Sequence, residues 1–416
     1  MLFLHMQYLL MRSWLKSRNC RMLMRHYWHK LPELAKSELQ NTEFLYVIGT
    51  MKRTGNLMDN ICSIDNLLLA YYKAKRGKGY LPYVAEYSRN LVENIVRLRS
   101  QLLSGEVSIG RYRYFNIYDP KLRKICAAAF EERIVHHAII NVCHSYFERH
   151  LIYDTYATRL CKGSYAAIDR ARNAMRHYAY VAKLDVRSYF ESISHDVLKN
   201  KLRRIFKDYR LLALIDKIID SYESTKNHGI PIGNLTSQYF ANFYLSFLDH
   251  YAKEIVGVPV YIRYMDDILL FGRTAADVKV YMRDIAQYAE KELDIKLKQP
   301  VFCSVDRGIS FLGYSLYPHK ILLNRRSKVR FKRKMGKYVD MYLSGKWTDT
   351  EFNEHIVPLF AFVRKAYTKS LRTDICKKYT VDGRNRLEPR SPWRQLEQQC
   401  AELSCFESEQ QYSRQP

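Results

Sequence analysis

The sequence predicts an α+β fold, in which antiparallel strands combine with long helices. Two apolar runs rich in β-branched and aromatic residues, 258–263 and 268–272, flank a tight turn, as the two strands of a hairpin should. Segments 57–103 and 274–293 instead carry apolar residues at helical spacing. A chain of 416 residues is long enough for two or three lobes, each with a core of its own.

The turn of the predicted hairpin reads Tyr264-Met265-Asp266-Asp267. An Asp-Asp pair by itself is usually a solvated turn. Two acids inside a hydrophobic hairpin, however, are costly unless a cation neutralises them. The apolar strands on both sides therefore favour a divalent metal ion as the partner of Asp266 and Asp267.

A third carboxylate, Asp185, ends another apolar run, 180–185, just where the chain turns toward a helix. Transfer of nucleotides by a two-metal mechanism needs carboxylates that hold two ions about 3.5–4 Å apart. Asp185, Asp266 and Asp267 meet that need if the fold brings them together.

The segment 229–238 (GIPIGNLTSQ) lies between the two acidic sites and precedes a run at helical spacing, 239–248. A glycine before a helix lets a nucleotide or a template base approach the backbone closely. In most proteins such a glycine only makes a turn, so this segment is weak evidence by itself.

Four segments in this order resemble the palm of a reverse transcriptase: 183–190 (KLDVRSYF), 232–238 (IGNLTSQ), 264–267 (YMDD) and 308–314 (GISFLGY). Upstream, the segments 119–125 and 130–138 are similar to the fingers of the bacterial branch, which includes group II intron, retron and diversity-generating enzymes. The resemblance covers roughly residues 105 to 335. It implies the right-hand polymerase architecture, with fingers, a palm built on an antiparallel sheet and a helical thumb.

The resemblance also predicts the boundaries of the domains. Residues 1–104 are expected to form an N-terminal extension and helices leading into the fingers, and 105–323 the fingers and palm. Residues 324–380 are expected to form the helical thumb. The remaining residues, 381–416, are rich in Arg, Gln and Ser with little periodicity, which predicts a mobile tail.

Two positions indicate which group of bacterial reverse transcriptases the chain resembles. Most reverse transcriptases carry Gln-Gly and Ser-Pro in the middle motif, whereas this chain has Ile232-Gly233 and Ser237-Gln238. This pairing resembles the reverse transcriptases of diversity-generating retroelements, which copy a template-repeat RNA into cDNA with errors concentrated at template adenines. A group II intron-like or retron-like enzyme is the alternative. An inactive RNA-binding scaffold is the alternative of another class, although the three intact acids favour an enzyme.

The resemblance assigns roles to single residues. Asp185, Asp266 and Asp267, with the backbone carbonyl of Val186, would hold two Mg²⁺ ions, with Mn²⁺ as a substitute. The Phe190 ring would lie beneath the sugar of the incoming nucleotide and collide with a 2′-hydroxyl, unless it is an ordinary core residue. The residues expected to bind the deoxynucleotide are Lys121, Arg123, Phe190, Ile232, Gly233 and Gln238, with Arg133 a weaker candidate.

One departure from the family concerns a lysine that relatives carry shortly before the Gly-x-x-Phe-Leu-Gly segment. The comparable place here reads 297–301 (LKQPV), with Lys298 shifted in register. The sequence therefore does not assign Lys298 the role of general acid for departure of pyrophosphate.

Lysines and arginines outnumber acids by 68 to 42, which gives a net charge of +26 and predicts salt-sensitive binding of nucleic acid. The basic residues are spread along the chain, which disfavours a membrane-surface protein. The run 324–337 contains eight basic residues and no acid. In the family this is the thumb, which would contact the phosphates of the RNA/cDNA duplex through Arg325, Arg326, Lys328, Arg330, Lys332, Arg333 and Lys334.

The nine cysteines form neither a CxxC pair nor a spaced Cys/His array, so a reducing cytoplasm is the expected location. The apolar opening, 1–11, is too short to span a bilayer, and no membrane association is expected. The expected partners are the template RNA, its duplex with cDNA and, by resemblance, a small basic accessory variability protein.

Overall fold

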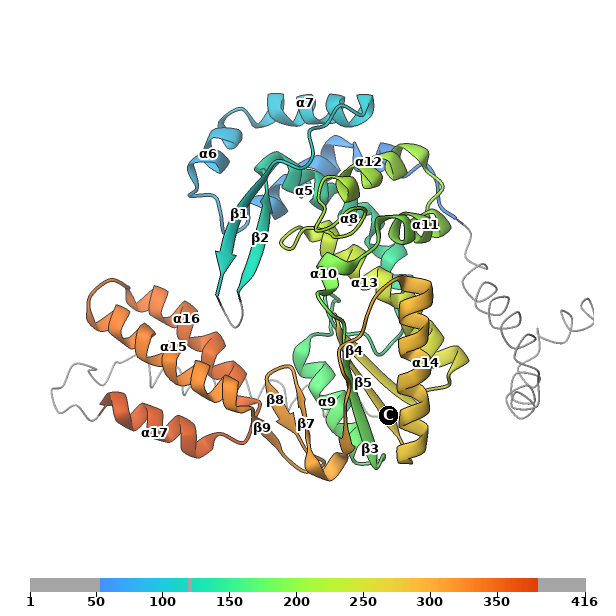
Figure 1. The fold of residues 1–416 in the computed structure, drawn as a ribbon. Helices are drawn as coiled ribbons and strands as arrows, with labels where there is room; N and C mark the ends of the chain where they lie inside the picture. The colour runs from blue at the N-terminus through green and yellow to red at the C-terminus, as the bar shows by residue number, and fades with distance from the viewer. Residues whose placement is uncertain (1–52, 119–121, 381–416) are drawn as a thin grey trace, which may run out of the picture.

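The computed structural model describes residues 53–118 and 122–380. The expected extension up to about residue 50, the candidate Lys121 and the expected tail 381–416 lie outside these ranges. The α+β prediction is confirmed, because helices surround three sheets whose strand pairs are all antiparallel (Figure 1).

The central sheet has the strand order β4-β5-β3-β6. Its strands are β3 (Tyr180–Asp185), β4 (Val260–Tyr264), β5 (Asp267–Gly272) and β6 (Val301–Ser304). Both strands of the predicted hairpin and the predicted strand at 180–185 are thereby confirmed. The register places Asp185 directly opposite Asp267.

Helices cover both faces of the central sheet. Successive strand residues point to opposite faces, so Val181 packs in the cluster that contains α9 (Ser164–Met175), and Ala182 packs in the cluster that contains α14 (Ala275–Leu293). Helix α14 begins with a capping box in which the Thr274 hydroxyl accepts a hydrogen bond from the Asp277 N–H. The predicted helix at 274–293 is confirmed.

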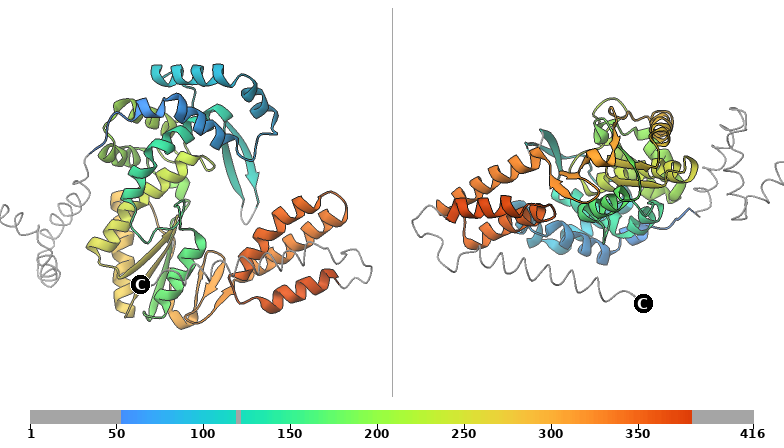
Figure 2. Two further views of the ribbon diagram at one scale, coloured as in Figure 1. Left: turned by 180° about the vertical axis from the view of Figure 1, so that it is seen from behind. Right: turned by 90° about the horizontal axis from the view of Figure 1, so that it is seen from below.

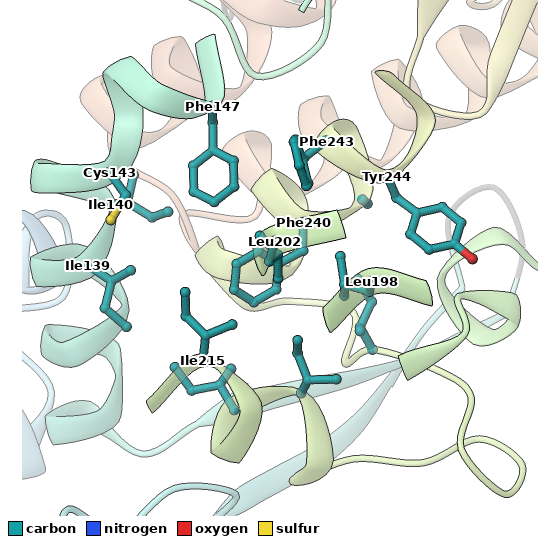
Figure 3. Packing of buried hydrophobic residues seen from close by; sticks show 14 of the residues in the cluster. Ile139, Ile140, Cys143, Phe147, Leu198, Leu202, Ile215, Phe240, Phe243 and Tyr244 are labelled. Carbon is teal, nitrogen blue, oxygen red and sulfur yellow. The ribbon is translucent and has the colours of Figure 1, made fainter. Parts of the chain in front are cut away.

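A helical layer lies above the sheet in Figure 1. Its core forms where α8 (Phe130–His150), α11 (His195–Ile205), α12 (Tyr209–Asp220) and α13 (Leu235–His250) meet, as Figure 3 shows. Helix α13 is buried along most of its length, which places it at the centre of this layer. The segment predicted at 57–103 forms α4 (Met58–Ile61), α5 (Ile64–Lys75), α6 (Pro82–Arg89) and α7 (Leu91–Ser104).

Two strands, β1 (Tyr112–Ile117) and β2 (Arg123–Ala128), form a hairpin that projects from the helical layer and is called the tip hairpin below (Figure 1). Arg133, the weaker triphosphate candidate, donates from Nε to the Ala128 carbonyl at 2.8 Å and ties α8 to this hairpin.

The C-terminal part starts with a small sheet of β7 (Ile309–Phe311), β8 (Tyr314–Leu316) and β9 (Ile321–Leu323). An arm of three helices follows: α15 (Arg325–Leu343), α16 (Asp349–Arg364) and α17 (Lys369–Thr380). Figures 1 and 2 show the arm extending away from the central sheet on the side opposite α14. The run of basic residues thus lies on α15, as a helix was expected there.

The turn before α13 docks on the tip hairpin. The Cys126 N–H donates to the Ile232 carbonyl at 2.8 Å. Gly233 has a φ of +127°, and a Cβ placed on it would lie 2.8 Å from the Cys126 carbonyl oxygen. The backbone that approaches Gly233 closely in the structure is therefore that of β2, so this glycine sets the distance between the tip hairpin and α13.

We expect Gly233→Ala to lower the free energy of unfolding by about 1–3 kcal/mol, because it combines left-handed strain with a backbone clash. Gly257→Ala is the matched control, since Gly257 also has a positive φ, +72°, but no atom within 4 Å of the added methyl group. Urea unfolding of both variants measures the difference. Equal losses would show that the contact with β2 tolerates a side chain.

Candidate active site

The three predicted acids gather at one end of the central sheet. Asp185 is the last residue of β3, and it faces Asp267, the first residue of β5, across the sheet. Side chains of directly opposed strand residues lie on the same face, with Cβ atoms about 4.5–5.5 Å apart. Asp266 precedes β5 in the turn from β4, where Met265 adopts a positive φ of 54°. The fold thus brings the three acids together.

Asp266 is electrostatically the most perturbed of the three. Burial raises the pKa of its carboxyl group above the ordinary value, and the charges of Asp267 and Asp185 raise it further, against the opposing influence of its own backbone hydrogen bond and of Lys298. A carboxyl group whose pKa is raised by neighbouring carboxylates lies where added positive charge is favourable.

Two lysines supply positive charge within the site. The Lys298 ammonium lies 2.6 Å from Asp185 Oδ1, and the Lys183 ammonium lies 2.6 Å from Asp267 Oδ1. The Lys298 N–H also donates to the Asp185 carbonyl at 2.8 Å. The sequence analysis left Lys298 without a role and missed Lys183. The alternation of β3 was the available signal, because Lys183 lies two residues before Asp185 and thus on the same face.

The donor set fits Mg²⁺, a hard cation that prefers carboxylate and carbonyl oxygens. Among residues 53–118 and 122–380, no three His, Cys, Asp or Glu side chains are arranged as a ready metal site. The two ion pairs explain this, because Asp185 and Asp267 are each turned toward a lysine. The acids have the right chemistry, and a divalent ion would have to replace two ammonium groups.

A fully buried ion pair lies beneath the turn. Arg263 in β4 and Asp249 in α13 are both 0% exposed. The guanidinium donates from Nε to Asp249 Oδ1 at 2.7 Å and from Nη2 to Oδ2 at 2.6 Å. The Tyr261 hydroxyl donates to the same carboxylate at 2.7 Å. This bidentate geometry is the strongest form of a charged hydrogen bond.

The other donors of Arg263 join the helix to the turn. Nη1 donates to Asn242 Oδ1 at 2.8 Å and to the Met265 carbonyl at 3.3 Å, and Nη2 donates to the Asn242 carbonyl at 3.0 Å. One guanidinium thereby connects α13, β4 and the turn that carries Asp266. Sequence reasoning missed this residue, although an arginine inside an apolar strand requires a buried acidic partner.

The residues predicted to contact the nucleotide lie at several places. Val186 is fully buried and pairs with Leu297, and Phe190 is half-buried in α10 (Tyr189–Ser192), with its ring 5.8 Å from that of Tyr189. Gln238 is half-buried in the first turn of α13, close to Ile232 in the chain. Arg123 is exposed on the tip hairpin.

A cavity of about 770 Å³ lies between the tip hairpin, α10 and the segment 294–296. Its lining includes three cations that the sequence analysis did not single out, Lys124, Arg187 and Lys296. Arg187 follows Asp185 by two residues, and its backbone N–H donates to the Lys296 carbonyl at 2.9 Å. The lining also holds three carboxylates, Glu191, Glu223 and Asp294. Through Arg187, a polar cavity of nucleotide size lies close to the end of β3.

Helix α15 presents most of its predicted nucleic-acid residues to solvent. Five of the seven are exposed, whereas Arg330 and Lys334 are half-buried, and the Arg330 guanidinium lies 5.7 Å from the Phe362 ring. Phe331 and Met335 on the opposite face are buried in the arm. The helix is amphipathic, with a continuous basic face.

Three acids at the end of an antiparallel sheet, near a polar cavity, are the groups that nucleotidyl transfer by two metal ions requires. Residues 113–316 match the family described as reverse transcriptase (RNA-dependent DNA polymerase). The chain carries a reverse transcriptase domain, the domain of RNA-directed DNA polymerases.

The chain is also similar to three other proteins. The chain is 20% identical over 292 residues to the COX1/OXI3 intron 1 protein of Saccharomyces cerevisiae, which covers 64% of this chain and 33% of the relative. It is 23% identical over 241 residues to the yeast COX1/OXI3 intron 2 protein, covering 52% of this chain and 28% of the relative. It is also 22% identical over 289 residues to protein YkfC of Escherichia coli, covering 57% of this chain and 76% of the relative.

The chain thus spans about a third of the length of the two yeast relatives. None of the helices in the described ranges is both long enough and apolar enough to cross a bilayer.

Replacing Arg263 by Met should lower the free energy of unfolding by about 3–5 kcal/mol, because Asp249 is left charged and unpaired in the core. Combining Arg263→Met with Asp249→Leu should recover part of the loss, since neither charge then remains. Arg283→Met is the matched control, because Arg283 pairs with Asp284 on the surface at 71% exposure. A loss no larger than that of the control would contradict a structural role for the buried pair.

Proposed function

We propose that this chain is an active RNA-directed DNA polymerase whose catalytic centre is formed by Asp185, Asp266 and Asp267. The observation that carries the proposal is the register of the central sheet, which sets Asp185 opposite Asp267 beside the Asp266 turn. Two Mg²⁺ ions held by these acids and the Val186 carbonyl would activate the attacking hydroxyl and stabilise the leaving oxygen. Mn²⁺ could take their place.

The chain's own residues have the remaining tasks. Lys183 and Lys298 offset the mutual repulsion of Asp267 and Asp185 until metal ions take their place. Lys124, Arg187 and Lys296 line the nearby cavity together with three carboxylates, and these cations would contact a bound triphosphate. Arg123 and Lys121 would contribute from the tip hairpin and its connecting turn. In this proposal the hairpin with its helices forms the fingers, the central sheet the palm, and the C-terminal arm the thumb.

The double variant Asp266→Asn, Asp267→Asn should lose Mg²⁺-dependent primer extension by several orders of magnitude while RNA affinity stays within about twofold, because the two acids act in ligation and not in RNA binding. Primer extension and filter binding on one preparation measure both quantities. Asp277→Asn, which changes an acid at the start of α14, controls for the loss of a carboxylate. Near-normal extension by the double variant would disprove the two-metal assignment.

We further propose that the Phe190 ring excludes ribonucleotides. Phe190→Ala should lower the preference for deoxynucleotides at least about tenfold, which corresponds to about 1.4 kcal/mol, because the truncated side chain leaves room for a 2′-hydroxyl. The ratio of kcat/KM for deoxy- and ribonucleotides gives the measurement. An unchanged ratio with lower stability would make Phe190 a core residue.

We also propose that the enzyme belongs to the diversity-generating type and copies a template-repeat RNA with errors at adenines, for mutagenic retrohoming. Ile232 and Gln238 support this subtype. The Ile232 carbonyl accepts a hydrogen bond from the Cys126 N–H. The aliphatic side chain of Ile232 would offer a base pair shape without a hydrogen bond. The template RNA and its cDNA duplex would lie along α15, and a small basic accessory protein would assemble with the enzyme.

Ile232→Gln should restore a hydrogen bond worth about 0.5–1.5 kcal/mol and lower misincorporation opposite template adenine by several-fold to about tenfold, with smaller changes at other bases. Deep sequencing of cDNA from the wild-type and variant enzymes measures this. Ile230 is buried, so Ile230→Gln is unsuitable as a control. Gln238→Pro alters the other distinguishing position and is the comparison. It should change the error rate at template adenines less than Ile232→Gln does.

The second candidate is a group II intron-like enzyme, which the similarity to two yeast intron proteins favours. The same sequencing experiment separates the candidates. A wild-type enzyme that copies adenine as accurately as other bases is of the intron-like or retron-like type.

A further inference from the structure

The segment 72–83 (YKAKRGKGYLPY), called the basic–aromatic loop below, comprises the end of α5, the connection 76–81 and the start of α6, and it has no role in the site described above. It contains four basic residues, three tyrosines and no acid. We propose that the basic–aromatic loop binds single-stranded RNA, with tyrosine rings stacking on bases and cations contacting phosphates. This inference deepens the proposed function, because the RNA would be template that extends beyond the catalytic centre.

The tyrosine rings of the loop are unusually accessible. Tyr80 is 82% exposed, Tyr72 is 62% exposed and Tyr83 is 41% exposed. The neighbouring Tyr71, by contrast, is buried and packs against Phe130, so the helix already has its aromatic core contact. Exposed rings offer flat surfaces on which successive unpaired bases can stack regardless of sequence.

The cations of the loop are not neutralised by the protein. The Lys73 ammonium donates to the Asn141 side-chain oxygen at 2.6 Å, and the Lys75 ammonium donates to the Tyr71 hydroxyl at 3.0 Å, so both partners are neutral. Within residues 53–118 and 122–380, no carboxylate forms an ion pair with Arg76 or Lys78. Burial and the charge of Arg133 lower the pKa of Lys78. The loop therefore carries positive charge that an approaching phosphate would stabilise.

The loop is ordered by its own backbone. The Lys78 N–H donates to the Lys75 carbonyl at 2.8 Å, and the Leu81 N–H donates to the Lys78 carbonyl at 3.1 Å. Gly77 adopts a φ of +70° between these turns, and Pro82 begins α6. A loop held in one conformation loses little conformational freedom when it binds a ligand.

The position of the loop suits a template strand. The Tyr83 ring lies 6.2 Å from the ring of Phe130, the first residue of α8, which follows the tip hairpin directly. Figures 1 and 2 show α6 beside the tip hairpin at the outer edge of the helical layer. A strand that leaves the catalytic centre across the tip hairpin would meet this loop next.

A solvated basic loop would explain the charge but not three exposed rings among the cations. An acidic protein segment would satisfy the cations, yet it has no flat groups for the rings. Single-stranded RNA offers phosphates to the cations and flat bases to the tyrosine rings. The chemistry of the loop therefore favours single-stranded RNA as its ligand.

The test uses fluorescence anisotropy of the full chain with a fluorescein-labelled twelve-nucleotide oligouridine and with a blunt RNA/DNA duplex of the same length. Tyr72→Ala with Tyr80→Ala should weaken oligouridine binding about tenfold or more and leave duplex binding unchanged. Tyr209→Ala with Tyr367→Ala is the matched control, because these rings are 78% and 65% exposed elsewhere. Equal weakening by both pairs, or no weakening by the first, would overturn the proposal.

A second variant, Arg76→Gln with Lys78→Gln, tests the phosphate contacts without touching a ring. It should lower the slope of log affinity against log salt by about 1.4, since each single-strand phosphate contact contributes about 0.7. An unchanged slope would remove these two cations from the binding site. Unchanged thermal melting of each variant shows that the fold is intact.

Primer extension separates this inference from the proposed function. The tyrosine variant should extend a primer normally on a template that overhangs by one nucleotide and should need a higher concentration of a template that overhangs by twelve. If the wild-type chain extends neither, the polymerase proposal fails, while the anisotropy comparison still decides the role of the loop. Equal efficiency of variant and wild type on the long template would count against the loop.

Discussion

The ion pair between Arg263 and Asp249 is the interaction on which the site depends. Both groups are without solvent contact, so each would be strongly unfavourable without the other. The bidentate geometry leaves little freedom in how β4 lies against α13, and the same guanidinium reaches the Met265 carbonyl in the turn. The position of the turn that carries Asp266 is therefore coupled to the position of one buried helix.

This coupling matters because the acids at the turn repel one another. Burial and the neighbouring carboxylates raise the pKa of Asp266, and two lysines at 2.6 Å offset the charges of Asp185 and Asp267. A turn without internal support would relieve such repulsion by moving the side chains apart. The other end of α13 begins two residues after Gly233, where the backbone of β2 packs closely. One helix thus joins the tip hairpin to the turn that carries Asp266, and a shift of one would displace the other.

Local patterns predicted the elements whose signals are contained in short stretches. The apolar run before Asp185, the apolar hairpin around Asp266 and the helical spacing of residues 274–293 are each visible within one short segment. The strands β7–β9 were missed because three residues are too short to show a period. Lys183, Arg263 and the cations of the cavity gain their roles only from contacts across the fold. An arginine within an apolar strand was visible in the sequence, but its partner in α13 was not.

Hydrogen exchange of backbone amides in Arg263→Lys tests the coupling most directly. Lysine keeps the charge next to Asp249 but cannot reach Asn242 and Met265 with the planar donors of a guanidinium. The account predicts that amides of residues 260–272 and of the second half of α13 lose protection in the variant by at least about tenfold, while those of α14 and of the tip hairpin keep theirs. Unchanged protection of residues 260–272, or an equal loss throughout the chain, would contradict the claim that this ion pair positions the turn that carries Asp266.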